Sequence, residues 1–177
     1  MFLDFDGVMI TERGTAFNKE DLGVTEDGFG TLFDDDAIET LKEIEQKASF
    51  SIVVTSNRRF VGLKQLRQMW KKRKLASNIL DITPLHAADD AIAHGEGNQG
   101  KIKAIEIKAW LQSHPEVKKY IIVDDEPIED AELQSHFIQC DPLWGLSDKI
   151  VEIIKNLNGT HYKPMPSPKG FNLLGGA

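Results

Sequence analysis

The sequence predicts an α/β fold, a three-layer Rossmann-like sandwich in which a mainly parallel central sheet lies between helices. Short apolar runs recur along the chain, and polar or turn residues close each run, as is typical of buried parallel strands. Stretches with helical periodicity fill the intervals between these runs. Strands that alternate with helices favour a parallel sheet whose right-handed crossovers cover both faces.

Five apolar runs are expected to form the strands. The run at 51–54 (SIVV) is β-branched and ends at Thr55, and the run at 120–123 (YIIV) ends at a pair of aspartates. Both are short enough and apolar enough for strands that are buried on two faces. In chain order, the predicted strands are residues 2–3, 51–54, 79–82, 120–123 and 137–140.

Four helices are expected between and after these strands. Residues 36–48 place Ile38, Leu41 and Ile44 at the spacing of one helix face. The remaining predicted helices, which show the same periodicity, are residues 60–73, 102–113 and 147–157.

Three segments do not fit the alternation of strand and helix. Residues 9–35 are interpreted as a flap or insertion after the first strand, and 87–100 as a loop. Residues 158–177 contain three prolines and are interpreted as a C-terminal tail. A length of 177 residues favours a single catalytic domain, at 1–157, followed by this tail.

Composition and charge exclude several classes of protein. No stretch approaches the roughly 18 consecutive apolar residues of a membrane span. The first residues do not resemble a signal peptide, and the single cysteine, Cys140, cannot form an internal disulfide, so a cytoplasmic location is expected. A net charge of −7 disfavours a general nucleic-acid binder.

One part of the chain is basic despite the acidic total. We interpret this basic segment either as a solvated helix face or as an attractor for a phosphorylated or acidic partner. Its members are Arg58, Arg59, Lys64, Arg67, Lys71, Lys72, Arg73 and Lys74.

Carboxylates follow two of the predicted strands. Asp4 and Asp6 end the first, and Asp124 and Asp125 end the fourth. Ligands of open α/β sheets bind beyond the carboxyl ends of the strands, so these acids are expected to converge in one crevice. Such a cluster repels itself without a cation, and oxygen ligands without His or Cys favour Mg²⁺ over zinc.

Other residues near the strand ends are of the types that bind a phosphate group and assist its transfer. Gly7 allows a sharp turn or a close approach of backbone to ligand. Thr55 and Ser56 offer hydroxyls and amides to phosphate oxygens, and a lysine that opens the following helix, Lys101 or Lys103, offsets negative charge. One acid can attack phosphorus while a second moves the proton.

These four pieces, in this order, resemble the motifs of the haloacid-dehalogenase (HAD) superfamily. FLDFDGV is similar to the first motif, IVVTSN to the second, KIKAIEIKAWL to the third and YIIVDDE to the fourth. The resemblance covers residues 1–125 and continues through the last predicted strand and helix. It implies a small member without a large cap domain, because neither 9–35 nor 58–100 leaves room for one.

The resemblance also implies a role for each matching residue. Asp4 would be the nucleophile and a metal ligand, and Asp6 the general acid and base, with its backbone carbonyl on the metal. Lys103 would be the lysine of the third motif, with Lys101 as the alternative.

The binding residues follow from the same resemblance. Thr55 would bind phosphate together with Ser56 or Asn57. Asp125 would hold Mg²⁺, assisted by Asp124.

Other interpretations of these motifs are weaker. The receiver fold of response regulators also uses acids, Thr or Ser and Lys, but its acid pair precedes the phosphoacceptor, which is the reverse of the order here. Residues 95–100 spell GxGxxG, yet no strand directly precedes them, as a dinucleotide-binding turn requires.

The expected function is therefore a magnesium-dependent phosphomonoester hydrolase that forms an aspartyl phosphate. A site without a large cap suits a macromolecular substrate, and a phosphoprotein is expected first. A polynucleotide end or a small metabolite is the alternative, as is a binding module without turnover. A phosphotransferase or mutase is disfavoured, because those enzymes use a cap to shield the intermediate from water.

Overall fold

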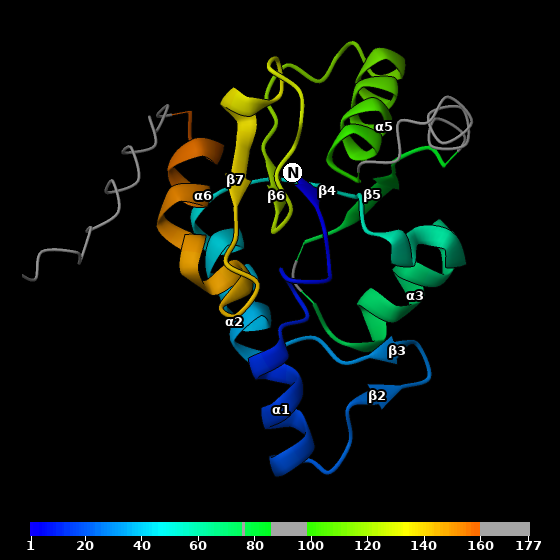
Figure 1. The fold of residues 1–177 in the computed structure, drawn as a ribbon, viewed down its shortest axis with the longest axis vertical. Helices are drawn as coiled ribbons and strands as arrows, with labels where there is room; N and C mark the ends of the chain where they lie inside the picture. The colour runs from blue at the N-terminus through cyan, green and yellow to red at the C-terminus, as the bar shows by residue number, and fades with distance from the viewer. Residues whose placement is uncertain (76, 86–98, 160–177) are drawn as a thin grey trace, which may run out of the picture.

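The computed structural model describes residues 1–75, 77–85 and 99–159. Its centre is a five-stranded parallel sheet in the order β5-β4-β1-β6-β7 (Figure 1). Every strand of this central sheet overlaps one of the predicted runs, so the predicted α/β fold with a mainly parallel sheet is confirmed. The strands are β1 (Phe2–Leu3), β4 (Ile52–Val54), β5 (Ile79–Ile82), β6 (Ile122–Asp124) and β7 (Phe137–Gln139).

Helices cover both faces of this sheet. Successive side chains of a strand point to opposite faces. In β1, Leu3 packs into the cluster built with α2, α3 and α6, whereas Phe2 packs against Ile107 and Trp110 of α5. The helices are α2 (Asp35–Lys47), α3 (Leu63–Lys72), α5 (Gln99–Ser113) and α6 (Ile150–Leu157), with 3₁₀ turns η1 (Asn57–Val61), η2 (Gln134–His136) and η3 (Gly145–Lys149).

Two of the predicted helices are divided in the structure. The stretch predicted as one helix at 60–73 is divided into η1 and α3, because Gly62 lies between them with a φ of 86°. The stretch predicted at 147–157 begins as η3 and continues as α6. Both changes lie at helix ends, where one turn of 3₁₀ geometry is common.

The segment predicted as a flap has structure of its own. It forms α1 (Glu12–Asp21), whose N-cap Thr11 accepts a hydrogen bond from the Gly14 N–H at 2.9 Å, and a hairpin of β2 (Glu26–Asp27) and β3 (Gly30–Thr31). Both lie beyond the carboxyl ends of the central strands (Figure 1). They are much smaller than a cap domain, and the predicted fold without a large cap is confirmed.

Two predicted segments lie mostly outside the described residues. These are the loop at 87–100, of which only the last two residues are described, and the tail at 158–177, of which only the first two are. Among the described helices, none combines the length and the hydrophobicity that crossing a membrane requires.

Candidate active site

Three neighbouring strands end in polar side chains at the same level of the sheet. Leu3 of β1 pairs in register with Val54 of β4 and Val123 of β6. The residues that directly follow Leu3, Val54 and Val123 are Asp4, Thr55 and Asp124, and all three are buried. Since Leu3, Val54 and Val123 belong to the cluster on the opposite face, alternation turns these three side chains toward α5.

Lys103 of α5 lies between two of these carboxylates. Its Nζ is 2.7 Å from Asp4 Oδ2 and 2.8 and 2.9 Å from the two oxygens of Asp124. Burial alone would lower the pKa of Lys103, but the charges of Asp4 and Asp124 raise it above its usual value. Lys103 therefore stays positively charged next to Asp4 and Asp124. Lys101, the alternative lysine, is exposed.

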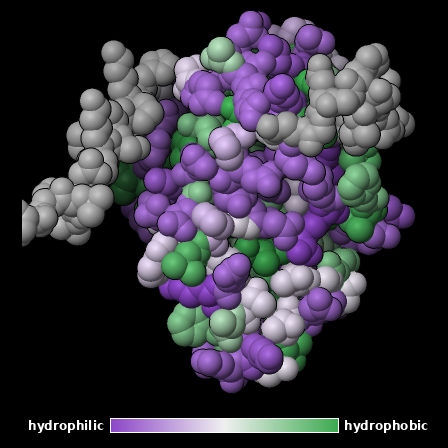
Figure 2. Space-filling model, viewed as in Figure 1, coloured by the Kyte–Doolittle hydropathy of each residue, from purple (hydrophilic) through white to green (hydrophobic). Residues whose placement is uncertain are grey.

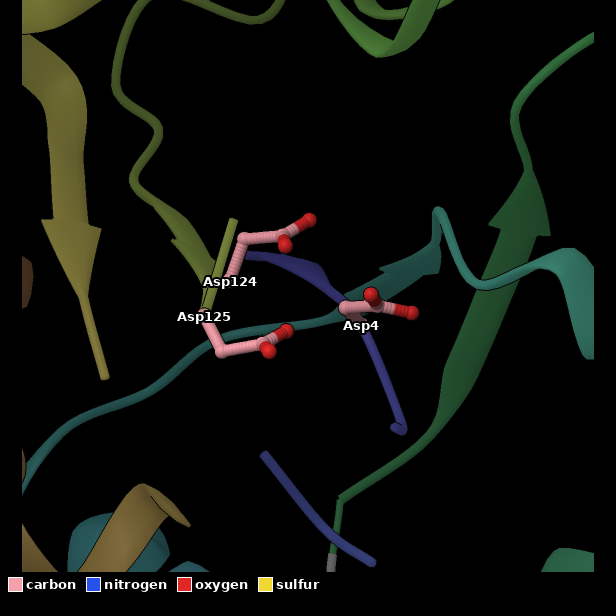
Figure 3. Close-up of side chains that lie close together, drawn as sticks. All are labelled: Asp4, Asp124 and Asp125. Atoms are coloured by element: carbon pink, nitrogen blue, oxygen red, sulfur yellow. The ribbon is translucent and has the colours of Figure 1, made fainter. Parts of the chain in front are cut away.

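Asp125 joins Asp4 and Asp124 in a compact acidic group. One carboxylate oxygen from each lies within 4.8 Å of the others, and Figure 3 shows the three side chains next to one another at the ends of β1 and β6. Burial and the charge of Asp4 raise the pKa of Asp124 to about 7, and the same two causes raise the pKa of Asp125. Lys103 alone therefore does not neutralise the negative charge of Asp4, Asp124 and Asp125.

The residues of this group fit a hard divalent cation. Carboxylate oxygens without His or Cys are the donor set that Mg²⁺ prefers. A cation would also offset the repulsion that raises the pKa of Asp124 and Asp125.

Asp6 has a different partner from the other acids. Its carboxylate is half-exposed and accepts hydrogen bonds from Arg58, from Nε at 3.0 and 3.1 Å and from Nη2 at 2.7 Å. The side chain therefore faces η1 and lies outside the three-carboxylate group. Its predicted roles, proton transfer and a backbone carbonyl ligand, stay predictions.

One cavity connects these groups, and we call it the acidic cavity. Its volume is about 310 Å³. Its lining residues come from the segment after β1, the start of α1, η1, α5 and the segments after β6 and β7, so chain segments far apart in sequence meet here. The lining consists of Asp4, Asp6, Gly7, Ile10, Glu12, Asn57, Gln99, Lys103, Asp125, Glu126 and Pro142.

Thr55 and Ser56, the predicted phosphate ligands, differ in how their hydroxyls are used. The Thr55 Oγ1 is buried and has no hydrogen-bond partner among the described residues, although its N–H donates to Leu3 O at 3.0 Å. The Ser56 Oγ accepts from the Arg58 N–H at 3.3 Å and caps η1. A buried hydroxyl without a partner is costly, so the Thr55 hydroxyl has unused capacity for a ligand oxygen.

Comparison with known protein families agrees with this arrangement. Residues 1–151 match the family described as the HAD domain in Swiss Army Knife RNA repair proteins. The chain belongs to this family. The predicted membership of the HAD superfamily is thereby confirmed, and at the level of the family it supports a phosphatase-type hydrolase function. No curated protein and no solved structure matches the chain.

A buried ion pair between Arg59 and Glu106 holds the backbone at Thr55 and Ser56 in this HAD domain, and the sequence analysis did not predict it. Arg59 donates from Nη1 to the carbonyls of Thr55 at 2.6 Å and Ser56 at 2.9 Å, and its Nη2 lies 2.5 Å from Glu106 Oε1. Burial lowers the pKa of Arg59 and raises that of Glu106 to about 7, although each charge opposes the shift of the other. Glu106 follows Lys103 by three residues, a spacing that places both on one helix face.

Gly7 of this HAD domain is required by geometry. Its φ is +68°, in the left-handed region, and a Cβ built on it would overlap the carboxyl group of Asp125. We expect Gly7→Ala to lower the free energy of unfolding by about 1–3 kcal/mol and to displace Asp125. Urea denaturation measures the first effect. Gly23→Ala is the matched control, since Gly23 has a φ of +66° but no neighbour within 4 Å of an added Cβ. Equal losses in both variants would contradict a specific clash at Gly7.

Other residues of interest have structural surroundings. Trp70 and Trp110 are buried, and Trp144 is half-exposed with the Arg13 guanidinium 4.6 Å from its ring. Cys140 is buried, and burial raises the pKa of its thiol, which disfavours a thiolate nucleophile. The GxGxxG stretch lies mostly outside the described residues, and its last glycine is already within α5.

Proposed function

We propose that this HAD domain is a magnesium-dependent phosphomonoester hydrolase that acts through an aspartyl phosphate on Asp4. The observation that carries the proposal is the buried row of Thr55, Asp4 and Asp124 with the Lys103 ammonium 2.7 Å from Asp4. A carboxylate next to a fixed cation and an unused hydroxyl is suited to attack a phosphorus atom while the phosphoryl oxygens are held.

The reaction has two steps that share one proton carrier. First, an Asp4 oxygen forms a bond to phosphorus, the ester P–O bond breaks, and Asp6 gives its proton to the leaving oxygen. Second, Asp6 takes a proton from water, the water oxygen bonds to phosphorus, and the bond to Asp4 breaks. Lys103 and the Thr55 hydroxyl hold phosphoryl oxygens in both steps.

The metal belongs to the same acidic group. Asp4 and Asp125 would hold it, with Asp124 and the backbone carbonyl of Asp6 in support. When bound, Mg²⁺ supplies positive charge that offsets the charge of nucleophile and phosphate.

The substrate we propose is the terminal phosphate of an RNA strand. The family occurs in RNA repair proteins, and no large cap encloses the site. A strand break is sealed between a 3′-hydroxyl and a 5′-phosphate, so a 3′-phosphate is the group whose removal repair chemistry needs. This reverses the preference drawn from the sequence, in which a phosphoprotein came first.

Metal removal tests this function. We expect release of inorganic phosphate from p-nitrophenyl phosphate and from a 3′-phosphorylated oligoribonucleotide, abolished by EDTA and restored by excess Mg²⁺, because the acidic group needs a cation. A 5′-phosphorylated strand, a phosphopeptide and a sugar phosphate complete the panel. Phosphate release that EDTA leaves unchanged would refute metal dependence. Binding of the RNA end without release of phosphate would mean that the domain is a binding module without catalytic activity.

A further inference from the structure

A second cavity lies on the other side of the Arg58–Asp6 ion pair from the acidic cavity, and we call it the aromatic cavity. It lies between the β2–β3 hairpin and η1–α3, with a volume of about 250 Å³. Arg58 lines it and also donates its hydrogen bonds to Asp6, which lines the acidic cavity. A ligand whose end reaches Asp4 can therefore extend past Arg58 into the aromatic cavity.

Aromatic rings and cations line this second cavity together. Phe29 and Phe33 contribute rings, with the Lys72 Nζ 5.7 Å from the centre of the first and the Arg73 guanidinium 4.6 Å from the centre of the second. At the rim, Val61 is more than half exposed. Figure 2 shows hydrophobic residues at the surface on the side of η1 and α3, next to hydrophilic ones.

Basic residues dominate the segment of η1 and α3 that borders the aromatic cavity. Residues 57–74 contain eight basic residues and no acidic one, in a chain whose net charge is −7. Arg58 and Arg73 pair with Asp6 and Asp27. Within the described residues, no carboxylate pairs with the lysines of this segment, which are Lys64, Lys71, Lys72 and Lys74.

We infer that the aromatic cavity holds an unpaired base next to the RNA end, with the strand continuing along the basic side of α3. This inference rests on the proposed function. Stacking on aromatic rings beside a cationic groove is how single strands bind without sequence preference. A cavity of about 250 Å³ is smaller than the usual pocket for a drug-sized ligand. It therefore suits one base rather than a base pair, and single-stranded ends are preferred over blunt duplex ends.

The test compares an RNA substrate with one that cannot reach the aromatic cavity. Steady-state kinetics are measured on a 3′-phosphorylated single-stranded oligoribonucleotide and on p-nitrophenyl phosphate. Phe29→Ala is expected to raise KM for the RNA roughly 5- to 150-fold, the range for loss of one stacked base. Lys72→Gln is expected to reduce the salt slope of log KM by about 0.7, the value for one phosphate contact on a single strand. Neither change alters kcat/KM for p-nitrophenyl phosphate.

Two further variants keep the result interpretable. Phe29→Trp retains a stacking surface and keeps KM for the RNA near that of the wild type, which separates stacking from a loss of fold. Lys119→Gln makes the same charge change as Lys72→Gln before β6, at the amino end of the sheet, and leaves both substrates unaffected.

The outcomes separate this inference from the proposed function. Wild-type hydrolysis of p-nitrophenyl phosphate with unchanged RNA kinetics in Phe29→Ala and Lys72→Gln overturns the inference and leaves the phosphatase function standing. Hydrolysis of a blunt duplex end as fast as the single strand also overturns it. So does a change in kinetics in Phe29→Ala and Lys72→Gln that is seen only with a phosphopeptide substrate. Absence of wild-type activity on every substrate removes the proposed function and this inference with it.

Discussion

Asp4→Asn is expected to lower the rate of phosphate release about ten-thousand-fold or more, because an amide cannot attack phosphorus and no second carboxylate occupies its position. Asp124 is buried in the same acidic group, and both of its oxygens accept hydrogen bonds from Lys103. The substitution preserves size, so the row of strand ends persists. Release of inorganic phosphate from p-nitrophenyl phosphate under saturating Mg²⁺ is the measurement.

The control for Asp4→Asn is an aspartate outside the site. Asp148→Asn removes the same charge from an exposed side chain that pairs with Lys149, and it is expected to leave the rate unchanged. Circular dichroism of both variants verifies that the fold is retained. A folded Asp4→Asn protein with wild-type turnover would falsify the assignment of the nucleophile.

The second large effect is expected on stability. Arg59→Met should lower the free energy of unfolding by about 3–5 kcal/mol, because it leaves the Glu106 carboxylate buried without its counter-charge. It also removes the donor that binds the carbonyls of Thr55 and Ser56. Urea denaturation monitored by circular dichroism measures the loss. The double variant with Glu106→Leu should recover a large part of it, since the unpaired charge is then gone.

The loss in Arg59→Met should depend on pH. Without the guanidinium, the folded-state pKa of Glu106 rises further above its unfolded value, since burial already raises it to about 7. The folded state then binds a proton that the unfolded state has released, so stability falls as pH increases between the two pKa values. The deficit should be smaller at pH 5 than at pH 8.

An exposed ion pair provides the comparison for this stability effect. Lys42 pairs with Glu39 on the surface of α2 at 2.7 Å. Lys42→Gln should change the free energy of unfolding by no more than about 0.5 kcal/mol, because solvent screens this pair. A loss in Arg59→Met as small as that in Lys42→Gln would contradict a supporting role for the buried pair.

The local sequence predicted the strands and the order of the polar residues that follow them. The apolar run at 51–54 and the acids after 120–123 are patterns of adjacent residues, and adjacent residues decide whether a strand is buried and where it ends. The same holds for the lysine at the start of α5. These signals were sufficient for the fold class, but they did not show that the Asp6 side chain lies outside the group of Asp4, Asp124 and Asp125.

Which distant side chains are in direct contact could not be predicted from these local patterns. Arg58 and Asp6 lie 52 residues apart in the chain, and Lys103 and Asp4 lie 99 apart. Their meeting depends on strand order and register, which place β1 between β4 and β6. The periodicity of α5 also gave no sign of a buried Glu106, because a charged residue at an inward position appears in the pattern only as an interruption.

The sequence by itself therefore determined which chemical groups the chain carries to the ends of its strands. Only the tertiary structure decided which of them share a cavity. It separated the Asp6 carboxylate, bound to Arg58, from the group of Asp4, Asp124 and Asp125. It also placed a basic, aromatic surface beside that cavity. The physical reason is that a sequence pattern describes residues adjacent in the chain. Electrostatic interactions and hydrogen bonds act through space, between segments that packing brings together.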